Sequence, residues 1–271
     1  MTRRSDDNSD IYSQRAARPF GLIANEPEAM LIARRLTAAG RRVLHVMLSP
    51  AARLGPGPNL EAAATPADIA IECDTIAIAI DDTRVFLQLL LGTPERPGLM
   101  NDLAPGTVLI DFGIRPPREA QSILGITGLR GVSVVDAALI GGGDALSRGT
   151  AKVLVGGYPD AVDAATPLLC ELGTIERTGP LGSAQTAAAL MGYVEAAHFA
   201  ARADAMTFGT ALGLQTHALT RILDDAPEEQ NVVRFQRRAE LAYKIAEERG
   251  LGGDVVAFRR LGPVETPTES G

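Results

Sequence analysis

The sequence predicts an α/β protein in which a doubly wound parallel sheet is followed by a smaller, all-α C-terminal domain. Between residues 20 and 177, short runs rich in Val and Ile alternate with segments of helical periodicity. This alternation is typical of a parallel sheet that helices cover on both faces. After residue 182, about thirty residues pass without a strand signal, so this part is expected to be helical.

Each expected element is bounded by residues that start or stop it. The expected strands are apolar runs flanked by polar residues or glycine: residues 20–24, 42–48, 75–80, 106–112, 132–139 and 151–157. The helices between them begin at proline or a polar residue and end at glycine: residues 27–40, 83–92, 116–125 and 158–173. In the second part, helices are expected over residues 183 to about 212, 215–223 and 232–249.

The expected organisation has four parts. Residues 1–18 are polar and without periodicity, and residues 263–271 form a polar tail, so both are expected to be disordered. Residues 19–182 are expected to form the sheet domain. Residues 183–262 are expected to form the helical domain, which begins with a long helix between the domains.

The composition restricts the classes of partner. With 26 Lys and Arg against 33 Asp and Glu, the net charge of −7 disfavours nucleic acid and anionic membranes. The sequence has no apolar run of membrane-spanning length, and Cys73 and Cys170 cannot form a disulfide framework. Three dispersed histidines do not have metal-ligand spacing. We therefore expect a cytoplasmic protein that takes a small-molecule ligand and holds no metal.

The turn after the first strand is where dinucleotide-binding proteins place the sequence G-x-G-x-x-G. Its three glycine positions hold Ala24, Glu26 and Ala29. A glutamate at the second position fills the space that the pyrophosphate needs and repels its charge. Glu26 and Glu28 also lie at a helix N-terminus, where a carboxylate takes the place of a bound anion.

The candidate cofactor site is therefore a degenerate one, made of Ala24, Asn25, Glu26 and Pro27. After the second strand, residues 47–50 supply neither an acid for a ribose nor an arginine for a 2′-phosphate. Two interpretations remain open: a Rossmann-like turn without a nucleotide, and a nucleotide bound in a rearranged way.

Several motifs together resemble the β-hydroxyacid dehydrogenase superfamily, which includes 3-hydroxyisobutyrate dehydrogenase, the 6-phosphogluconate dehydrogenases and the imine reductases. Residues 136–142 read D-A-A-L-I-G-G, similar to the family's substrate loop D-A-P-V-S-G-G. Upstream, residues 105–111 resemble the family's strand P-G-T-x-x-I-D. The resemblance covers about residues 20–250. It implies a Rossmann-like domain, a long interdomain helix, NAD(P) as cofactor and a homodimer, and it implies substrate contacts at Asp136, Gly141, Gly142 and Gln185.

The departures from this family fall on its reactive residues. The family's helix motif G-x-G-Q-x-x-K-x-x-N-N carries a proton-transferring lysine, but here that position is Ala188, and the asparagines are Met191 and Gly192. The family's Ser-Thr pair after the I-D strand is Gly113-Ile114. The C-terminal part is also shorter than in the family.

A rebuilt site would need other titratable groups. Helical spacing places Glu195 on the stripe of Ala188, so Glu195 and its neighbour Tyr193 are the candidate catalytic acids or bases, with purely structural roles as the alternative. Arg115 and Arg118 are candidates to clamp a carboxylate, with surface arginines as the blander interpretation.

Three hypotheses follow for function. The first is a pseudoenzyme that binds a ligand or a partner, or a non-redox enzyme, using the interdomain cleft for a small organic acid or amine. The second is an NAD(P)-dependent oxidoreductase of the 3-hydroxyacid dehydrogenase or imine reductase type with a rebuilt active site. The third is a heteromeric partner of an active paralogue.

Overall fold

A computed structural model describes residues 18–25, 29–49 and 57–224. The chain divides into two compact units, Met1–Ala189 and Leu190–Gly271. The predicted N-terminal arm up to residue 17, the helix at 232–249 and the tail at 263–271 lie outside the described residues. In the described part, none of the helices combines the length and the apolar character that crossing a bilayer demands.

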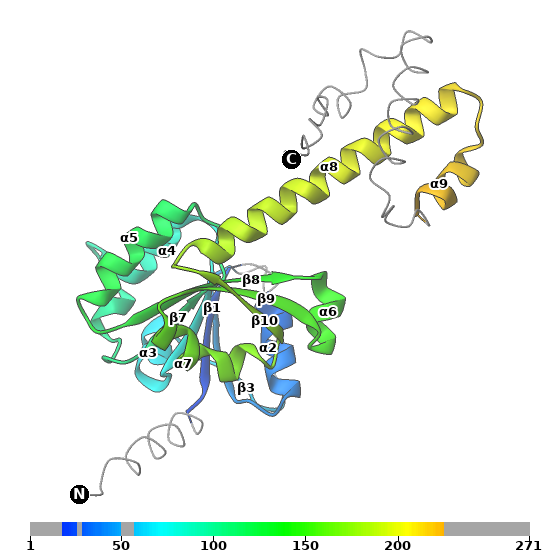
Figure 1. The fold of residues 1–271 in the computed structure, drawn as a ribbon. Helices are drawn as coiled ribbons and strands as arrows, with labels where there is room; N and C mark the ends of the chain where they lie inside the picture. Colours follow the sequence, from blue (N-terminus) through cyan, green and yellow to red (C-terminus); the bar gives the residue numbers. More distant parts are fainter. Residues whose placement is uncertain (1–17, 26–28, 50–56, 225–271) are drawn as a thin grey trace, which may run out of the picture. The chain divides into compact units, whose positions relative to one another are not determined.

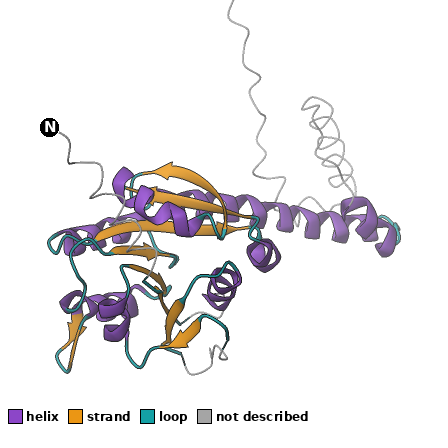
Figure 2. Ribbon diagram, turned by 90° about the horizontal axis from the view of Figure 1, so that it is seen from below, coloured by secondary structure: helices purple, strands orange, loops and turns teal. Residues whose placement is uncertain are grey.

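The first unit is built on one large sheet flanked by helices (Figures 1 and 2). In spatial order the strands are β10 (Gly173–Gly179), β9 (Ala151–Gly157), β8 (Ser133–Ile140), β7 (Val108–Asp111), β4 (Thr75–Ala79), β1 (Phe20–Ala24), β2 (Val43–Met47) and β3 (Leu60–Ala62). All neighbouring pairs are parallel except β8 and β9. This arrangement confirms the predicted fold class, with one antiparallel step added.

Two apolar cores fill the faces of this sheet. On one face the core is completed by α2 (Ala29–Ala38), α6 (Gly142–Arg148) and α7 (Pro159–Leu169). On the other face it is completed by α3 (Pro66–Glu72), α4 (Thr83–Leu91) and α5 (Pro117–Gly128). Strands that are buried on both faces need continuous apolar sequence, which is why the central strands were predictable.

The predicted elements of the first unit are all present, and several others were missed. The missed elements are β3, α3, α6, β10, the short hairpin of β5 (Gly92–Thr93) and β6 (Arg96–Pro97), and the 3-10 turn Leu99–Asn101. Strand β10 is half exposed along its length, so it has no apolar run to reveal it. The start of α3 did carry a signal, because Thr65 and Asp68 form a capping box around Pro66.

The described part of the second unit is helical. It contains most of α8 (Ser183–Ala211), which begins in the first unit, and α9 (Thr216–Asp224). Helix α8 matches the predicted helix over residues 183 to about 212. A Cβ on Gly209 would lie 2.7 Å from Leu219 Cδ1, so glycine lets α9 approach α8 closely at this point.

The buried His45 predicts a specific pH dependence of stability. His45 lies in β2, its Nδ1 has no hydrogen-bond partner, and burial lowers its pKa below the ordinary value of 6.5. The unfolded chain therefore takes up a proton near pH 6.5 that the folded chain resists. The free energy of unfolding should fall below pH 6.5, at up to about 1.4 kcal/mol per pH unit, until the lowered pKa is reached.

Urea denaturation between pH 5 and 7.5 measures this slope. His45→Gln should flatten the slope, whereas His217→Gln, at an exposed position, should leave it unchanged. Equal slopes for the wild type and His45→Gln would show that His45 does not cause the effect.

Candidate functional site

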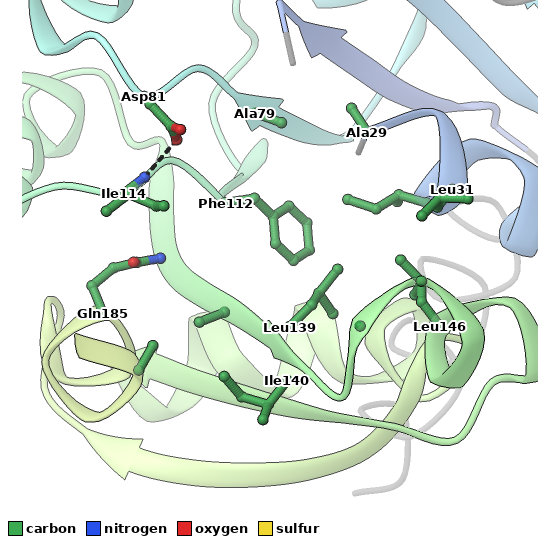
Figure 3. A pocket seen from close by; sticks show the side chains of 15 residues that line it. Ala29, Leu31, Ala79, Asp81, Phe112, Ile114, Leu139, Ile140, Leu146 and Gln185 are labelled. Atoms are coloured by element: carbon green, nitrogen blue, oxygen red, sulfur yellow. Dashed lines mark hydrogen bonds between the residues drawn. The ribbon is translucent and has the colours of Figure 1, made fainter. Parts of the chain in front are cut away.

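A pocket of about 510 Å³ opens at the carboxyl ends of the parallel strands in the first unit (Figure 3). This edge of a doubly wound sheet is where such folds bind ligands, and the volume suits a small organic molecule. The pocket is lined by Ala29, Leu31, Ile32, Ala79, Asp81, Phe112, Ile114, Ala138, Leu139, Ile140, Gly142, Gly143, Leu146, Gln185 and Ala188. Almost all of these side chains are apolar, and Asp81 is the only charged one among them.

One wall of the pocket is held in place by Arg115, which follows β7. Its guanidinium is buried and makes a two-point ion pair with Asp111, at 2.5 Å from Nε to Oδ2 and 2.8 Å from Nη2 to Oδ1. Nη2 also donates to the carbonyl oxygen of Ile80 at 2.8 Å, and Nη1 donates to Thr83 at 3.4 Å. The cation lies over the ring of Phe86. Arg115 thereby joins the loop after β4 to the loop after β7.

This result corrects both interpretations of Arg115 from the sequence. The side chain is neither a surface arginine nor free to clamp a ligand, because its donors are used within the fold. Burial raises the pKa of Asp111, and the Arg115 guanidinium and the Gly113 N–H oppose that shift. Arg118, by contrast, is exposed.

Gly113 and Asp81 complete the connection between the two loops. A Cβ on Gly113 would overlap both the Arg115 guanidinium and the Ile80 carbonyl oxygen, so only glycine leaves room for their hydrogen bond. The N–H of Ile114 donates to Asp81 Oδ1 at 2.8 Å, as Figure 3 shows. Asp81 and Ile114 therefore lie side by side in the pocket wall.

Asp136 was predicted to contact a substrate, but it does not line the pocket. Its buried carboxylate accepts hydrogen bonds from the N–H groups of Gly182, Ala184 and Gln185, at 2.8 to 3.1 Å. Burial raises the pKa of Asp136, and these N–H donors oppose the shift. The carboxylate thus accepts from N–H groups at the start of α8 and joins this helix to β8.

Of the other predicted substrate residues, some line the pocket and one does not. Gln185 and Gly142 line the pocket, whereas Gly141 does not. Gln185 is fixed because its Nε2 donates to the Ala137 carbonyl oxygen at 2.8 Å. Gly141 has φ of 113° and begins α6, so its role is to turn the chain.

The predicted cofactor residues are only partly described. Ala24 is buried at the end of β1, and the N–H of Asn25 donates to the Ala79 carbonyl oxygen at 3.2 Å. The side-chain oxygen of Asn25 is buried without a hydrogen-bond partner. Glu26 and Pro27 lie outside the described residues.

The candidate catalytic residues belong to the second unit. Glu195 and Tyr193 lie on α8 with exposed side chains, as does His198. Ala188, at the lysine position of the motif, lines the pocket. Gly192, at an asparagine position, has open space where a side chain would be. The described part of the chain has no group of three or more His, Cys, Asp or Glu residues able to hold a metal ion.

Comparison with known proteins decides the family. Residues 30–186, more than half of the chain, match the NAD binding domain of 6-phosphogluconate dehydrogenase. The chain belongs to the β-hydroxyacid dehydrogenase-like superfamily. This result confirms the resemblance found in the motifs. The match begins at residue 30, directly after the turn that carries the altered glycine positions.

Individual relatives agree with this family. The chain is 32% identical over 127 residues to an NAD-dependent L-serine dehydrogenase of Pseudomonas aeruginosa, covering 46% of this chain and 43% of the relative. It is 27% identical over 197 residues to 3-hydroxyisobutyrate dehydrogenase of the same organism, covering 71% and 64%. The alignments thus span about half to two thirds of these relatives. The solved imine reductase of Myxococcus stipitatus with NADP⁺ has the same fold, with a TM-score of 0.69 at 15% identity and coverage of 90% and 93%.

Three apolar residues of the pocket stand at positions where the family motifs have polar residues. Ile140, Ile114 and Ala188 occupy the positions of the family motifs' Ser, Thr and Lys, and all three line the pocket. The motif comparison named the departures at Ile114 and Ala188, and Ile140 lies within the loop motif quoted above. The structure adds that they meet in one cavity.

The family implies an NAD(P) cofactor, and two polar side chains of the described residues, those of Asp81 and Asn25, bear on its pyrophosphate. The pyrophosphate is an anion whose oxygens only accept hydrogen bonds. The charged side chain lining the pocket is the Asp81 carboxylate, and the unpartnered atom of the first turn, Asn25 Oδ1, is also an acceptor. Neither of these two oxygen atoms supplies the positive charge that favours a phosphate.

Asp81 and the burial of Arg115 were not found from the sequence. A carboxylate directly after the strand at 75–80 was the available signal for Asp81, because ligands of this fold bind at the carboxyl ends of strands. The burial of Arg115 had no comparable signal.

The ion pair leads to a prediction about stability. Arg115→Met should destabilise the protein by about 3–5 kcal/mol, because it leaves the Asp111 carboxylate buried without its partner. Urea denaturation measures the change. Arg118→Met, at an exposed site three residues later, is the matched control and should stay within about 0.5 kcal/mol of the wild type. A wild-type free energy of unfolding for Arg115→Met would contradict the assigned role of the pair.

Proposed function

We propose that this protein binds a small organic molecule in the pocket at the carboxyl edge of its sheet and does not carry out the pyridine-nucleotide redox reaction of its family. The observation that carries the proposal is the apolar character of the pocket at Ile114, Ile140 and Ala188. These are the motif positions at which the family has Thr, Ser and Lys, so the polar groups of the dehydrogenase site are missing together.

The first turn supports the absence of nucleotide binding. By sequence, Glu26 stands at the second glycine position and Glu28 follows in the same turn. Two carboxylates there oppose a pyrophosphate by charge, and the larger side chain opposes it by volume.

The pocket itself has the properties of a binding site. Its walls come from β8, α2, α6, α8 and the loops after β4 and β7, and the Arg115 contacts fix two of these loops. A pocket that is rigid before binding loses little conformational entropy when the ligand enters. These properties support a role as a ligand-binding pseudoenzyme or as a non-redox enzyme.

A second candidate function is an NAD(P)-dependent oxidoreductase with a rebuilt active site. The match to an NAD binding domain favours it, as does the likeness to a solved imine reductase that holds NADP⁺. A wild-type rate of NAD(P)H-dependent reduction that Glu195→Gln lowers at least about tenfold would establish this alternative.

The partner of the helical unit is proposed to be a second copy of this chain. Large apolar side chains of α8 are exposed in the chain described here: Leu190, Tyr193, Val194 and Phe199. An exposed apolar surface of this kind is typical of an interface. Contact with an active paralogue would use the same surface.

A titration with NADH and NADPH tests the proposed function. The wild type should show no saturable binding up to about millimolar nucleotide, measured by calorimetry or by nucleotide fluorescence. Ala24→Gly/Glu26→Gly restores the first two glycine positions and should tighten binding at least about tenfold. Glu95→Gly removes an exposed carboxylate elsewhere and should change nothing. Micromolar binding by the wild type would overturn the proposal.

A further inference from the structure

The polar groups of the pocket indicate the charge of its ligand. Asp81 carries the pocket's charge, and one of its carboxylate oxygens accepts from the Ile114 N–H. Within the described residues, the other oxygen has no hydrogen-bond partner, and Asp81 forms no ion pair. The neighbouring Asp82 differs, because it caps α4 through the N–H groups of Arg84 and Val85 and also pairs with the Arg84 side chain.

The nearest buried cation does not neutralise Asp81. The Arg115 guanidinium is matched by Asp111, and its remaining hydrogen bonds go to Ile80 and Thr83. Among the described residues that line the pocket, Asp81 is therefore a carboxylate without a paired cation. Asp81 lies at one end of the pocket beside Ile114, and Phe112, Leu139 and Ile140 form apolar walls farther in (Figure 3).

The second polar side chain of the pocket also presents an acceptor. Gln185 donates one N–H of its Nε2 to the Ala137 carbonyl oxygen, and its amide oxygen is an acceptor for a ligand donor, beside the second N–H of the same amide. One feature of the pocket would favour an anionic ligand instead: the N-terminal end of α6, at Gly142 and Gly143, where the helix dipole is positive. That helix has only seven residues, and the carboxylate of Asp144 in its first turn offsets the positive charge of the helix dipole.

We propose that the pocket selects a small organic amine with an apolar body over the matching acid, with Asp81 as the residue that recognises the ammonium group. This inference rests on the proposed function, since it assigns the chemical class of ligand at the same site. An ammonium group supplies both the positive charge that matches Asp81 and the N–H donors that the Asp81 carboxylate and the Gln185 amide oxygen can accept. The apolar walls accommodate the rest of the molecule.

A matched set of probes tests this proposal by calorimetry at pH 7 and low ionic strength, where screening is weak. The probes are phenethylamine, phenethyl alcohol and phenylacetate, which share an aromatic body and differ in charge. The wild type should bind the amine at least about tenfold more tightly than the acid, with the alcohol between them.

Two variants locate the origin of the preference. Asp81→Asn keeps an oxygen for the Ile114 N–H and removes the charge, so it should abolish the preference for the amine while retaining alcohol binding. Asp102→Asn removes an exposed carboxylate away from the pocket, so it should keep the full preference. The comparison separates Asp81 from the general attraction of a protein with a net charge of −7.

Each other outcome overturns the proposal. Equal binding of amine and acid, tighter binding of the acid, an unchanged preference in Asp81→Asn, or no binding of any probe would each do so. Binding of NADH by the wild type would instead refute the proposed function and leave the preference for the amine to be measured separately.

Discussion

The pocket depends on the buried ion pair between Asp111 and Arg115. Burying two charges is costly, and the pair is tolerated because Arg115 also satisfies the Ile80 carbonyl oxygen and contacts the ring of Phe86. These contacts fix the loops that follow two adjacent parallel strands. The positions of Asp81 and Ile114 in the pocket wall follow from this arrangement, and it requires glycine at position 113.

A second buried carboxylate performs a similar task at α8. Asp136 takes three N–H groups from the start of that helix, so the orientation of the first turn of α8 is fixed from strand β8. Gln185 and Ala188 reach the pocket from this turn and the next. The protein thus has the framework of the family's NAD binding domain, and the residues lining the pocket are mostly apolar.

The sequence predicted the elements that have a clear local pattern of apolar residues. The central strands are continuous apolar runs, and α8 has no competing strand signal, so both were found. Strand β10 and the turn into α6 depend on tertiary pairing and on glycine conformation, and local pattern does not reveal these. Among the site residues, Gln185, Gly142 and Ala188 were placed by motif, because motif position fixes the neighbourhood of a side chain. The burial of Arg115 and the capping by Asp136 were not predictable, since each joins residues that only the fold brings together.

Methyl NMR of protein labelled at Ile, Leu and Ala reports on ligand binding in the pocket itself. Ile114, Leu139, Ile140 and Ala188 report from different walls of the cavity. We expect their resonances to stay unchanged when NADPH is added to about millimolar concentration and to shift in a saturable way with a small apolar amine. Saturable shifts of these methyl groups with NADPH, and none with the amine, would contradict the account.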